Sequence, residues 1–404
     1  MENPMNHTTI NKPDTWCSMW GNAVSIAEHR PESYAKDITL RYPVYAPFDG
    51  TSLKFTFDNY CGSEPVSITK ATVSVADFNT NSDSAPKIHL SCPQKKSTTT
   101  QITFLGNPSV TLDAHKRIVS DEVSFQVQAG QTLCVNLYFA DFTLMQSAVL
   151  ITGPLSKGFF SLGDQTLTED LPLDTSKTTS WFYFLSNIDI LTSSDNRAVI
   201  CYGDSITAQA WPDELTLRLR REGRKHTSII RRAASGTRIL RQYDCITYDS
   251  YGLKGSNRFL HEIPTAGADT IIIQQGINDI IHPVGTDINP FRPMSDLPTA
   301  EELIDGLKWY TDQAHSLGLS VYIGTLLPIE GWRTYAPFRE ELKNKVNEWI
   351  RQADGFEGCI DFDLAVRDST NPAAFKAGYD SGDHLHPSSA GYKAMADAVS
   401  LRFL

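Results

Sequence analysis

An apolar run that ends in Gly203-Asp-Ser205 constrains the fold of this chain more than any other stretch. Residues 198–202 (Ala-Val-Ile-Cys-Tyr) are all apolar, which fits a strand buried on both faces of a parallel sheet. Gly-Asp-Ser is turn chemistry, so the strand should end there. Open parallel sheets bind ligands at the carboxyl ends of their strands. Ser205 is therefore a candidate nucleophile.

The chain after residue 197 alternates between predicted strands and helices. Further strands are expected at 228–230, 270–274, 320–325 and 359–362, and helices after Pro212, at 340–352 and at 390–401. Thr299-Ala-Glu-Glu302 is a capping box that opens another helix, with apolar positions from Leu303 to Leu317 facing inward and Gly318 ending it. This alternation predicts a three-layer α/β/α domain over 197–404, with a parallel five-stranded sheet and right-handed crossovers.

The amino-terminal half has a different pattern, typical of antiparallel sheet. Short β-rich runs separated by Gly, Pro, Asn and Asp occur at 38–46, 52–57, 66–75, 99–105, 123–127, 132–139, 148–152 and 181–191. They predict an all-β sandwich, jelly-roll-like, over 1–192, with an irregular connection at 155–177 and a linker at 192–196. Core packing already explains its aromatic residues, so a structural or cleft-shaping role is favoured over sugar binding.

Three later stretches carry the remaining candidate chemistry. They are Ala233-Ala-Ser-Gly236-Thr-Arg238, Gln274-Gln-Gly276-Ile-Asn278-Asp279 and Asp383-His-Leu-His386-Pro387. With Gly203-Asp-Ser205 before them, their order resembles the four blocks of the SGNH (GDSL-type) hydrolases. The resemblance implies that Ser205 is the nucleophile, that His386 and Asp383 are base and orienter, and that Ser205, Gly236 and Asn278 form the oxyanion hole. Asp279 is expected to hold its loop.

Residue chemistry is consistent with these roles. A serine hydroxyl is a poor nucleophile near neutral pH, so it needs a base within hydrogen-bond reach and a third group that orients the base. Asp383 and His386, three residues apart, can supply both. Two other interpretations remain for this stretch: a surface loop, or a metal site, because Asp383, His384 and His386 are all ligand types. Two imidazoles two residues apart converge on one ion only on a strand or turn, so no metal is predicted.

Five residues are predicted to line the substrate cleft. Gln209 and Trp211 follow the nucleophile closely, His282 and Trp332 lie on the long loops 280–298 and 329–337, and His384 adjoins the candidate base. Long loops in compact domains are often functional. These loops are expected to select the alcohol portion of an ester, although each could also be an ordinary surface loop.

Composition excludes several partner classes. The net charge of -11 argues against nucleic acid and anionic membranes, which require basic patches, and favours neutral substrates. Seven scattered cysteines without a C-x-x-C pair make a disulfide framework unexpected. The start, Met1 to His7, has no basic and apolar signal regions, and no apolar run of membrane-spanning length occurs. A cytoplasmic location is therefore expected.

Together these features predict a serine esterase without metal or organic cofactor. Within the family, a β-rich module ahead of the hydrolase domain looks most like carbohydrate O-acetylesterases, so the resemblance implies a small-molecule ester substrate, an acetylated sugar or oligosaccharide. A lysophospholipase or another hydrolase of longer acyl esters or thioesters would use the same residues. A sugar-binding protein with an inactive hydrolase domain is a third interpretation. The sequence does not specify the oligomeric state.

Overall fold

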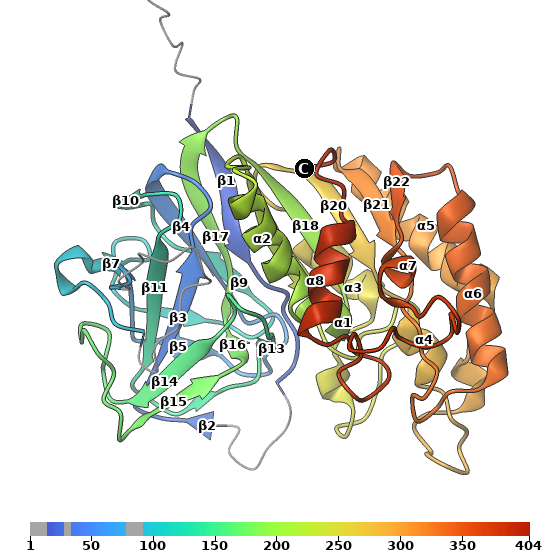
Figure 1. The fold of residues 1–404 in the computed structure, drawn as a ribbon. Coiled ribbons are helices and arrows are strands. Elements are labelled where there is room, and N and C mark those ends of the chain that lie inside the picture. The colour runs from blue at the N-terminus through green and yellow to red at the C-terminus, as the bar shows by residue number, and fades with distance from the viewer. Residues whose placement is uncertain (1–13, 28–33, 78–91) are drawn as a thin grey trace, which may run out of the picture.

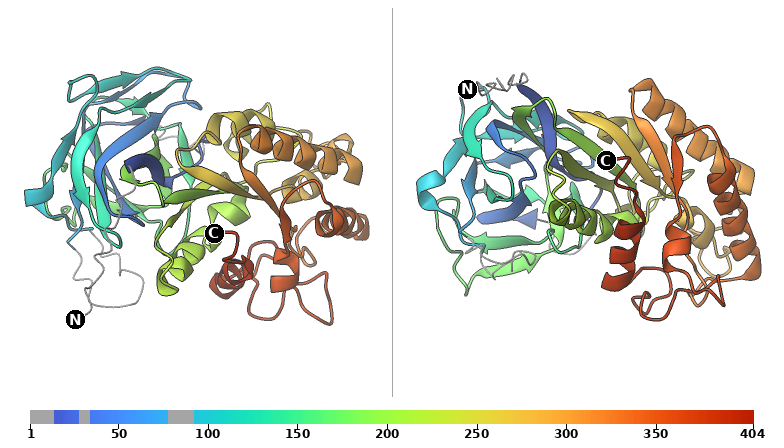
Figure 2. Two further views of the ribbon diagram at one scale, coloured as in Figure 1. Left: turned by 90° about the horizontal axis from the view of Figure 1, so that it is seen from above. Right: turned by 45° about the horizontal axis from the view of Figure 1, so that its top comes forward.

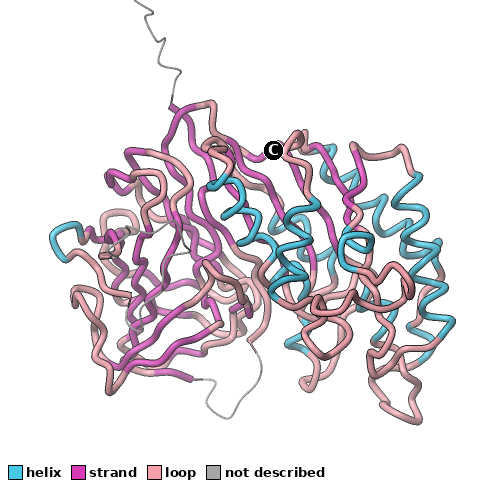
Figure 3. Tube along the Cα trace, viewed as in Figure 1, coloured by secondary structure: helices cyan, strands magenta, loops and turns pink. Residues whose placement is uncertain are grey.

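The computed structural model describes residues 14–27, 34–77 and 92–404. Two parts follow one another along the chain: a β region, the described residues from 14 to 193, and an α/β region, residues 197–404 (Figures 1 and 3). Residues Met1 to His7, which contributed to the predicted location, lie outside the described residues. Within the described residues, no helix has the length and apolar character that crossing a bilayer requires.

The α/β region contains the predicted parallel sheet. Its strands are β18 (Arg197–Gly203), β19 (Thr227–Ala233), β20 (Ala268–Gln274), β21 (Ser320–Gly324) and β22 (Gly358–Ile360). They lie in the order β19-β18-β20-β21-β22, and every neighbouring pair is parallel. The strand that ends before Ser205, β18, has a neighbouring strand on each side, and its residues 198–203 are buried on both faces, which explains the uninterrupted apolar run.

Helices cover both faces of this sheet. They are α1 (Ser205–Ala208), α2 (Trp211–Arg221), α3 (Gly255–Glu262), α4 (Ile277–Ile281), α5 (Ala300–Ser316), α6 (Pro337–Gln352), α7 (Phe362–Val366) and α8 (Ser389–Ala398), with short 3-10 turns at Asp249–Tyr251 and Met294–Asp296. Figure 2 shows α2 and α8 on one face and α3 and α5 on the other. The predicted three-layer α/β/α architecture is confirmed.

Helix α5 illustrates what local sequence specifies. Thr299 and Glu302 form the predicted reciprocal capping box, and Leu303 and Leu307 are buried. Leu317, predicted to face inward, is 49% exposed. It is the C-cap residue, beyond the last helical turn, so helical periodicity no longer sets its direction.

The β region consists mainly of two antiparallel sheets. One has the order β1-β17-β4-β10 with β9 also paired to β4, and the other the order β15-β14-β3-β11-β6-β7. Side chains from both sheets, including Phe55, Leu137 and Tyr42, belong to one buried core.

The strands of the β region have the following bounds: β1 (Asp14–Gly21), β2 (Tyr34–Ala35), β3 (Ile38–Tyr45), β4 (Gly50–Asp58), β5 (Val66–Ile68), β6 (Lys70–Val75), β7 (Thr100–Ile102), β8 (Val110–Leu112), β9 (Arg117–Val119), β10 (Val123–Val127), β11 (Thr132–Phe139), β12 (Thr143–Leu144), β13 (Ala148–Leu150), β14 (Gly158–Leu162), β15 (Ser176–Thr179), β16 (Trp181–Tyr183) and β17 (Leu185–Ser193), with a 3-10 turn at Lys96–Thr98. The all-β prediction is confirmed, whereas the jelly-roll arrangement stays a prediction.

Several strand predictions in this region were wrong in detail. The run at 66–75 forms two strands in different sheets, β5 and β6. The stretch 155–177, expected to be irregular, contains β14, which pairs with β3. The run at 181–191 is divided into β16 and β17 by Phe184, whose φ is +62°. A left-handed residue breaks a strand without leaving a turn signature in the sequence.

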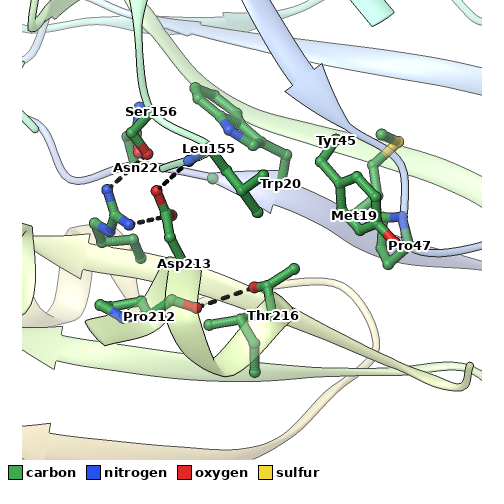
Figure 4. A pocket seen from close by; sticks show the side chains of 13 residues that line it. Met19, Trp20, Asn22, Tyr45, Pro47, Leu155, Ser156, Pro212, Asp213 and Thr216 are labelled. Carbon is green, nitrogen blue, oxygen red and sulfur yellow. Dashed lines mark hydrogen bonds and ion pairs between the residues drawn. The ribbon is translucent and has the colours of Figure 1, made fainter. Parts of the chain in front are cut away.

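The two regions are in direct contact. Strand β1 packs against β19, and the predicted linker is a tight turn between β17 and β18 in which Asn196 N–H donates to Ser193 O at 3.0 Å. Figure 4 shows a second contact, where Asp213 of α2 accepts the Leu155 N–H at 2.9 Å. Asp213 also pairs with Arg231, whose Nη1 donates to Ser156 Oγ at 3.0 Å. The hydrogen bonds to Leu155 and Ser156 attach the β region beside the start of α2, and the buried Asp213–Arg231 ion pair holds their partners in place.

Candidate active site

The candidate nucleophile lies where β18 meets α1. Asp204 is the N-cap of α1 and accepts the Ile206 N–H at 3.1 Å, which fixes the turn after Gly203. Ser205 is the first residue of the helix and is largely buried. Burial raises the pKa of Asp204 to about 7, assisted by the charge of Asp279. Figure 1 shows α1 and α4 at the same end of the sheet, the carboxyl end of its strands.

The carboxyl-terminal loop brings His386 and Asp383 to this serine. Ser205 Oγ lies 2.9 Å from His386 Nε2, and His386 Nδ1 lies 2.6 Å from Asp383 Oδ2. The other oxygen, Oδ1, accepts the N–H groups of Leu385 at 3.0 Å and His386 at 2.8 Å. Burial alone would raise the pKa of Asp383, but hydrogen bonds from His386 and Leu385 lower it to about 2. An ionised Asp383 therefore faces Nδ1 at neutral pH.

Of the other candidate oxyanion residues, Gly236 lies on the loop after β19, and Asn278 of α4 contacts that loop. Gly236 has φ of +77°, and a Cβ on it would lie 2.6 Å from the ring of Tyr251, so the loop requires glycine here. Asn278 Nδ2 donates one hydrogen to Thr237 O at 3.1 Å, which leaves its second hydrogen for a ligand. The N–H groups of Ser205 and Gly236 donate no hydrogen bond to any of the described residues. Each of the three candidate residues thus keeps a donor that no described residue occupies.

Asp279, predicted to hold its own loop, holds the loop that carries Gly236. Its carboxylate accepts the N–H groups of Ile239 at 2.8 Å and Leu240 at 3.0 Å. Burial raises the pKa of Asp279 to about 6, although these two hydrogen bonds oppose the shift. The acid belongs to the framework behind the site, because both its oxygens are occupied by backbone donors.

Sequence reasoning missed Arg258, which supports the same loop from α3. Its guanidinium is buried and donates to Thr237 Oγ1 at 3.0 Å and to Arg232 O at 2.9 Å. Burial alone would lower the pKa of Arg258, but the carboxylate of Glu262 raises it above its ordinary value. The spacing of Arg258 and Glu262, four residues apart, was the available signal, but helix α3 itself was not predicted.

The five residues predicted to line the cleft differ in how deeply they are buried. Gln209 and Trp332 are half-buried, and His384 is exposed. Trp211 was predicted wrongly: it is fully buried, its Nε1 donates to Thr207 Oγ1 at 3.3 Å, and its ring packs on Phe362. Its position in the first turn of α2 directs the indole into the core rather than into the cleft.

His282 also departs from the predicted role. Its imidazole is buried, with ring centroids 5.0 Å from Tyr251 and 5.9 Å from Tyr243. Burial, assisted by the charge of Arg292, lowers the pKa of His282 well below its ordinary value. The neutral, enclosed ring packs against the aromatic side chains behind Gly236, so the structure assigns it to the framework of this loop and not to the cleft wall.

The two histidines of the loop do not converge on one point. His384 Nδ1 lies 2.6 Å from Asp380 Oδ2, whereas His386 is held between Ser205 and Asp383. Across residues 14–27, 34–77 and 92–404, no group of three or more His, Cys, Asp or Glu side chains is placed to hold a metal ion. Each imidazole is therefore paired with a different carboxylate.

Comparison with known proteins places the site within a family. Residues 201–394 match the model of the GDSL-like Lipase/Acylhydrolase family. Among solved structures, the chain is similar to a GDSL-like lipase from Bacteroides thetaiotaomicron, at 17% identity over 52% of this chain and 88% of that one, with a TM-score of 0.35. It is also similar to an acetyl xylan esterase from Geobacillus stearothermophilus, at 18% identity over 50% of this chain and 92% of that one, with a TM-score of 0.37. No curated protein matches.

Proposed function

We propose that the α/β region, which belongs to the GDSL-like lipase/acylhydrolase family, is a serine esterase with Ser205, His386 and Asp383 as its catalytic triad. One observation carries the proposal: the two consecutive hydrogen bonds of 2.9 Å and 2.6 Å that join the hydroxyl, the imidazole and the carboxylate. This is the geometry that activates a serine hydroxyl.

The acylation step follows from these contacts. Asp383 accepts the Nδ1 hydrogen, so Nε2 carries the lone pair that removes the hydroxyl proton while Ser205 Oγ attacks the carbonyl carbon. Asp383 stabilises the imidazolium that results. His386 then protonates the alcohol oxygen, the carbon–oxygen bond breaks, and an acyl ester on Ser205 remains. Water, deprotonated by His386, attacks this ester, and the free acid leaves with Ser205 restored.

Oxyanion stabilisation is proposed to come from three groups. The N–H groups of Ser205 and Gly236 and the free Nδ2 hydrogen of Asn278 would donate to the oxygen that gains charge in the tetrahedral intermediate. A single donor of this kind typically contributes about 3 kcal/mol to catalysis. The hydrogen bond from Asn278 to Thr237 O supports this role because it prearranges the amide before substrate binds.

The proposed substrates are short-chain esters, in the first place O-acetyl groups on sugars or oligosaccharides. Support comes from side chains near the carboxyl end of the sheet: Arg333 and His384 are exposed and offer hydrogen-bond donors, and the half-buried Trp332 ring lies beneath the Arg333 guanidinium. The β region (predicted to span 1–192) would shape the cleft of the hydrolase domain (predicted to span 197–404) and requires no sugar site of its own.

Acyl-chain length tests the substrate proposal against hydrolysis of longer acyl esters or thioesters. Each methylene buried in a fitted acyl pocket would add about 0.8 kcal/mol of binding, so an enzyme for long chains should prefer long 4-nitrophenyl esters. We expect kcat/KM to be highest for acetate and to fall by butyrate or hexanoate. A maximum at octanoate would favour the longer-chain alternative, and failure of a fluorophosphonate to label Ser205 would favour an inactive, sugar-binding protein.

A further inference from the structure

A cavity lies beside the loop that carries Gly236, one of the proposed oxyanion donors. Its volume is about 500 Å³, and its lining residues come from two segments, 238–254 and 290–296. Arg238 belongs to its wall and follows Gly236 by two residues, which places the two Cα atoms within about 8 Å of each other. Cavities of several hundred Å³ are typical of small-molecule sites.

Two side chains in the wall of this cavity have buried polar atoms without partners. The Arg238 side chain is only 3% exposed and Tyr243 only 9%, and neither Arg238 Nε nor Tyr243 Oη has a hydrogen-bond partner among the described residues. An unpaired buried polar group destabilises the folded protein. Their presence is explained if oxygen atoms of a ligand pair with them.

The same two side chains are held rigidly in place. The Arg238 guanidinium lies over the Tyr243 ring, 4.3 Å from its centroid, and Nη1 lies 3.3 Å from Asp296 Oδ2. Tyr243 also contacts Tyr248, with ring centroids 4.8 Å apart. Rigid donors lose little entropy when they bind a ligand.

The rim of the cavity adds an aromatic platform and further donors. Phe291 is 49% exposed and lines the cavity, and the side chains of Arg241 and Lys254 lie on its wall. The C–H face of a sugar ring packs on an aromatic ring, and its hydroxyls accept hydrogen bonds from guanidinium and ammonium groups. This combination fits a saccharide better than an acyl chain.

We propose that the cavity is a second sugar subsite, which binds a saccharide unit linked to the acetylated one. The proposal rests on the proposed esterase function, because Ser205 defines where the acetylated unit lies. It predicts that the protein prefers acetylated oligosaccharides over acetylated monosaccharides. Phe291 would stack on the ring of the second unit, and Tyr243 Oη and Arg238 Nε would bind its oxygens.

The test compares matched substrates. We would measure kcat/KM for singly acetylated xylo-, cello- and manno-tetraose and for the singly acetylated methyl glycoside of each sugar. For at least one of the three sugars, kcat/KM for the tetrasaccharide should exceed kcat/KM for the methyl glycoside by more than about 10-fold. Tyr243→Phe and Phe291→Ala should each lower this ratio of kcat/KM values about three- to tenfold. Equal ratios in the wild type and both variants would overturn the proposal.

Two controls separate binding from folding. Phe142→Ala removes an aromatic residue of the β region that is 73% exposed and should leave the ratio unchanged. The melting temperature of Tyr243→Phe should equal or exceed that of the wild type, because its hydroxyl is buried without a partner among the described residues. A lower melting temperature would show that this hydroxyl serves the fold and would contradict the assignment.

Direct binding separates the subsite from the esterase function. If the wild type hydrolyses none of the acetyl esters, the proposed function fails, and calorimetry with the unacetylated tetrasaccharides decides the subsite alone. Binding of one tetrasaccharide that weakens in Tyr243→Phe and Phe291→Ala would support the subsite. Absence of binding by all three sugars would eliminate it.

Discussion

Two Asp–His pairs lie within seven residues of one loop, and they have the same internal geometry. In each, imidazole Nδ1 is 2.6 Å from a carboxylate oxygen, of Asp383 for His386 and of Asp380 for His384. They differ at the second ring nitrogen: His386 Nε2 meets Ser205 Oγ, whereas His384, whose Cγ, Cδ2 and Nδ1 atoms lie near Gly331, has no such hydroxyl partner among the described residues. An Asp–His pair is thus not a catalytic unit by itself; the group that faces the second nitrogen decides its role.

The backbone explains why the two rings diverge. Asp380 accepts the N–H groups of Gly382 at 2.8 Å and His384 at 3.0 Å, so the turn around Asp380 overlaps the turn around Asp383. His384 has φ of +63°, a conformation that few residues other than glycine adopt. This left-handed residue points the two imidazoles in different directions although only Leu385 separates them.

The largest expected effect comes from removing the group that distinguishes the pairs. Ser205→Ala should lower kcat/KM for 4-nitrophenyl acetate by about 10⁴- to 10⁶-fold, because no other hydroxyl faces His386 Nε2 among the described residues. Its melting temperature should stay close to that of the wild type, since the hydroxyl makes a single hydrogen bond, to His386, among the described residues. Turnover at the wild-type rate would refute the triad.

Replacing each histidine in turn by alanine tests the comparison of the two Asp–His pairs directly. His386→Ala should reduce kcat more than about 10³-fold, because it removes the group that transfers the proton. His384→Ala should cost less than about tenfold, because its ring meets no reacting group. The reverse ranking would show that the other pair is catalytic.

Replacing the two carboxylates should give the same ranking: the loss of kcat should be larger for Asp383 than for Asp380, and each loss should be smaller than that of its histidine partner. Asp383→Asn should lower kcat by about 10²- to 10⁴-fold, since an amide favours the wrong imidazole tautomer and cannot stabilise the imidazolium. Asp380→Asn removes the matching charge from the other pair and serves as the control. Equal losses in kcat for both variants would mean that the loop needs both acids for its fold, and melting temperatures would reveal this.

Chelation tests whether the two pairs share a metal ion. We expect no change in kcat/KM after dialysis against a chelator, because the two imidazoles serve separate carboxylates. Loss of activity that added Zn²⁺ restores would support the metal site over the triad.

The smallest expected effect concerns acids whose pKa values shift in opposite directions. The pKa of Asp204 is raised to about 7 by burial, so its contribution to folding stability is complete below about pH 4 and is lost as pH rises to 7. The pKa of Asp383 is lowered to about 2, so its contribution is present above about pH 4 and is lost as pH falls to 2. Asp204→Asn should therefore flatten the fall of melting temperature between pH 4 and 7. An unchanged slope would contradict the raised pKa.

Several features of this protein follow from local sequence alone. The apolar run before Ser205 specifies a buried strand, Thr299 and Glu302 specify the start of α5, and the order of four short blocks identifies the family to which residues 201–394 belong. Each depends on residues that are neighbours in the chain, where hydrophobic periodicity and capping operate.

Other features were decided by contacts between distant residues. Sequence spacing could not show that Trp211 is buried against Phe362, that Arg258 supports Thr237, or that β14 joins β3. Residue chemistry alone also left His384 and His386 with the same options, and the family resemblance was what assigned the base to His386. The fold supports that assignment by placing Ser205 opposite His386, because proton transfer depends on a hydrogen bond between residues that lie 181 positions apart in the chain.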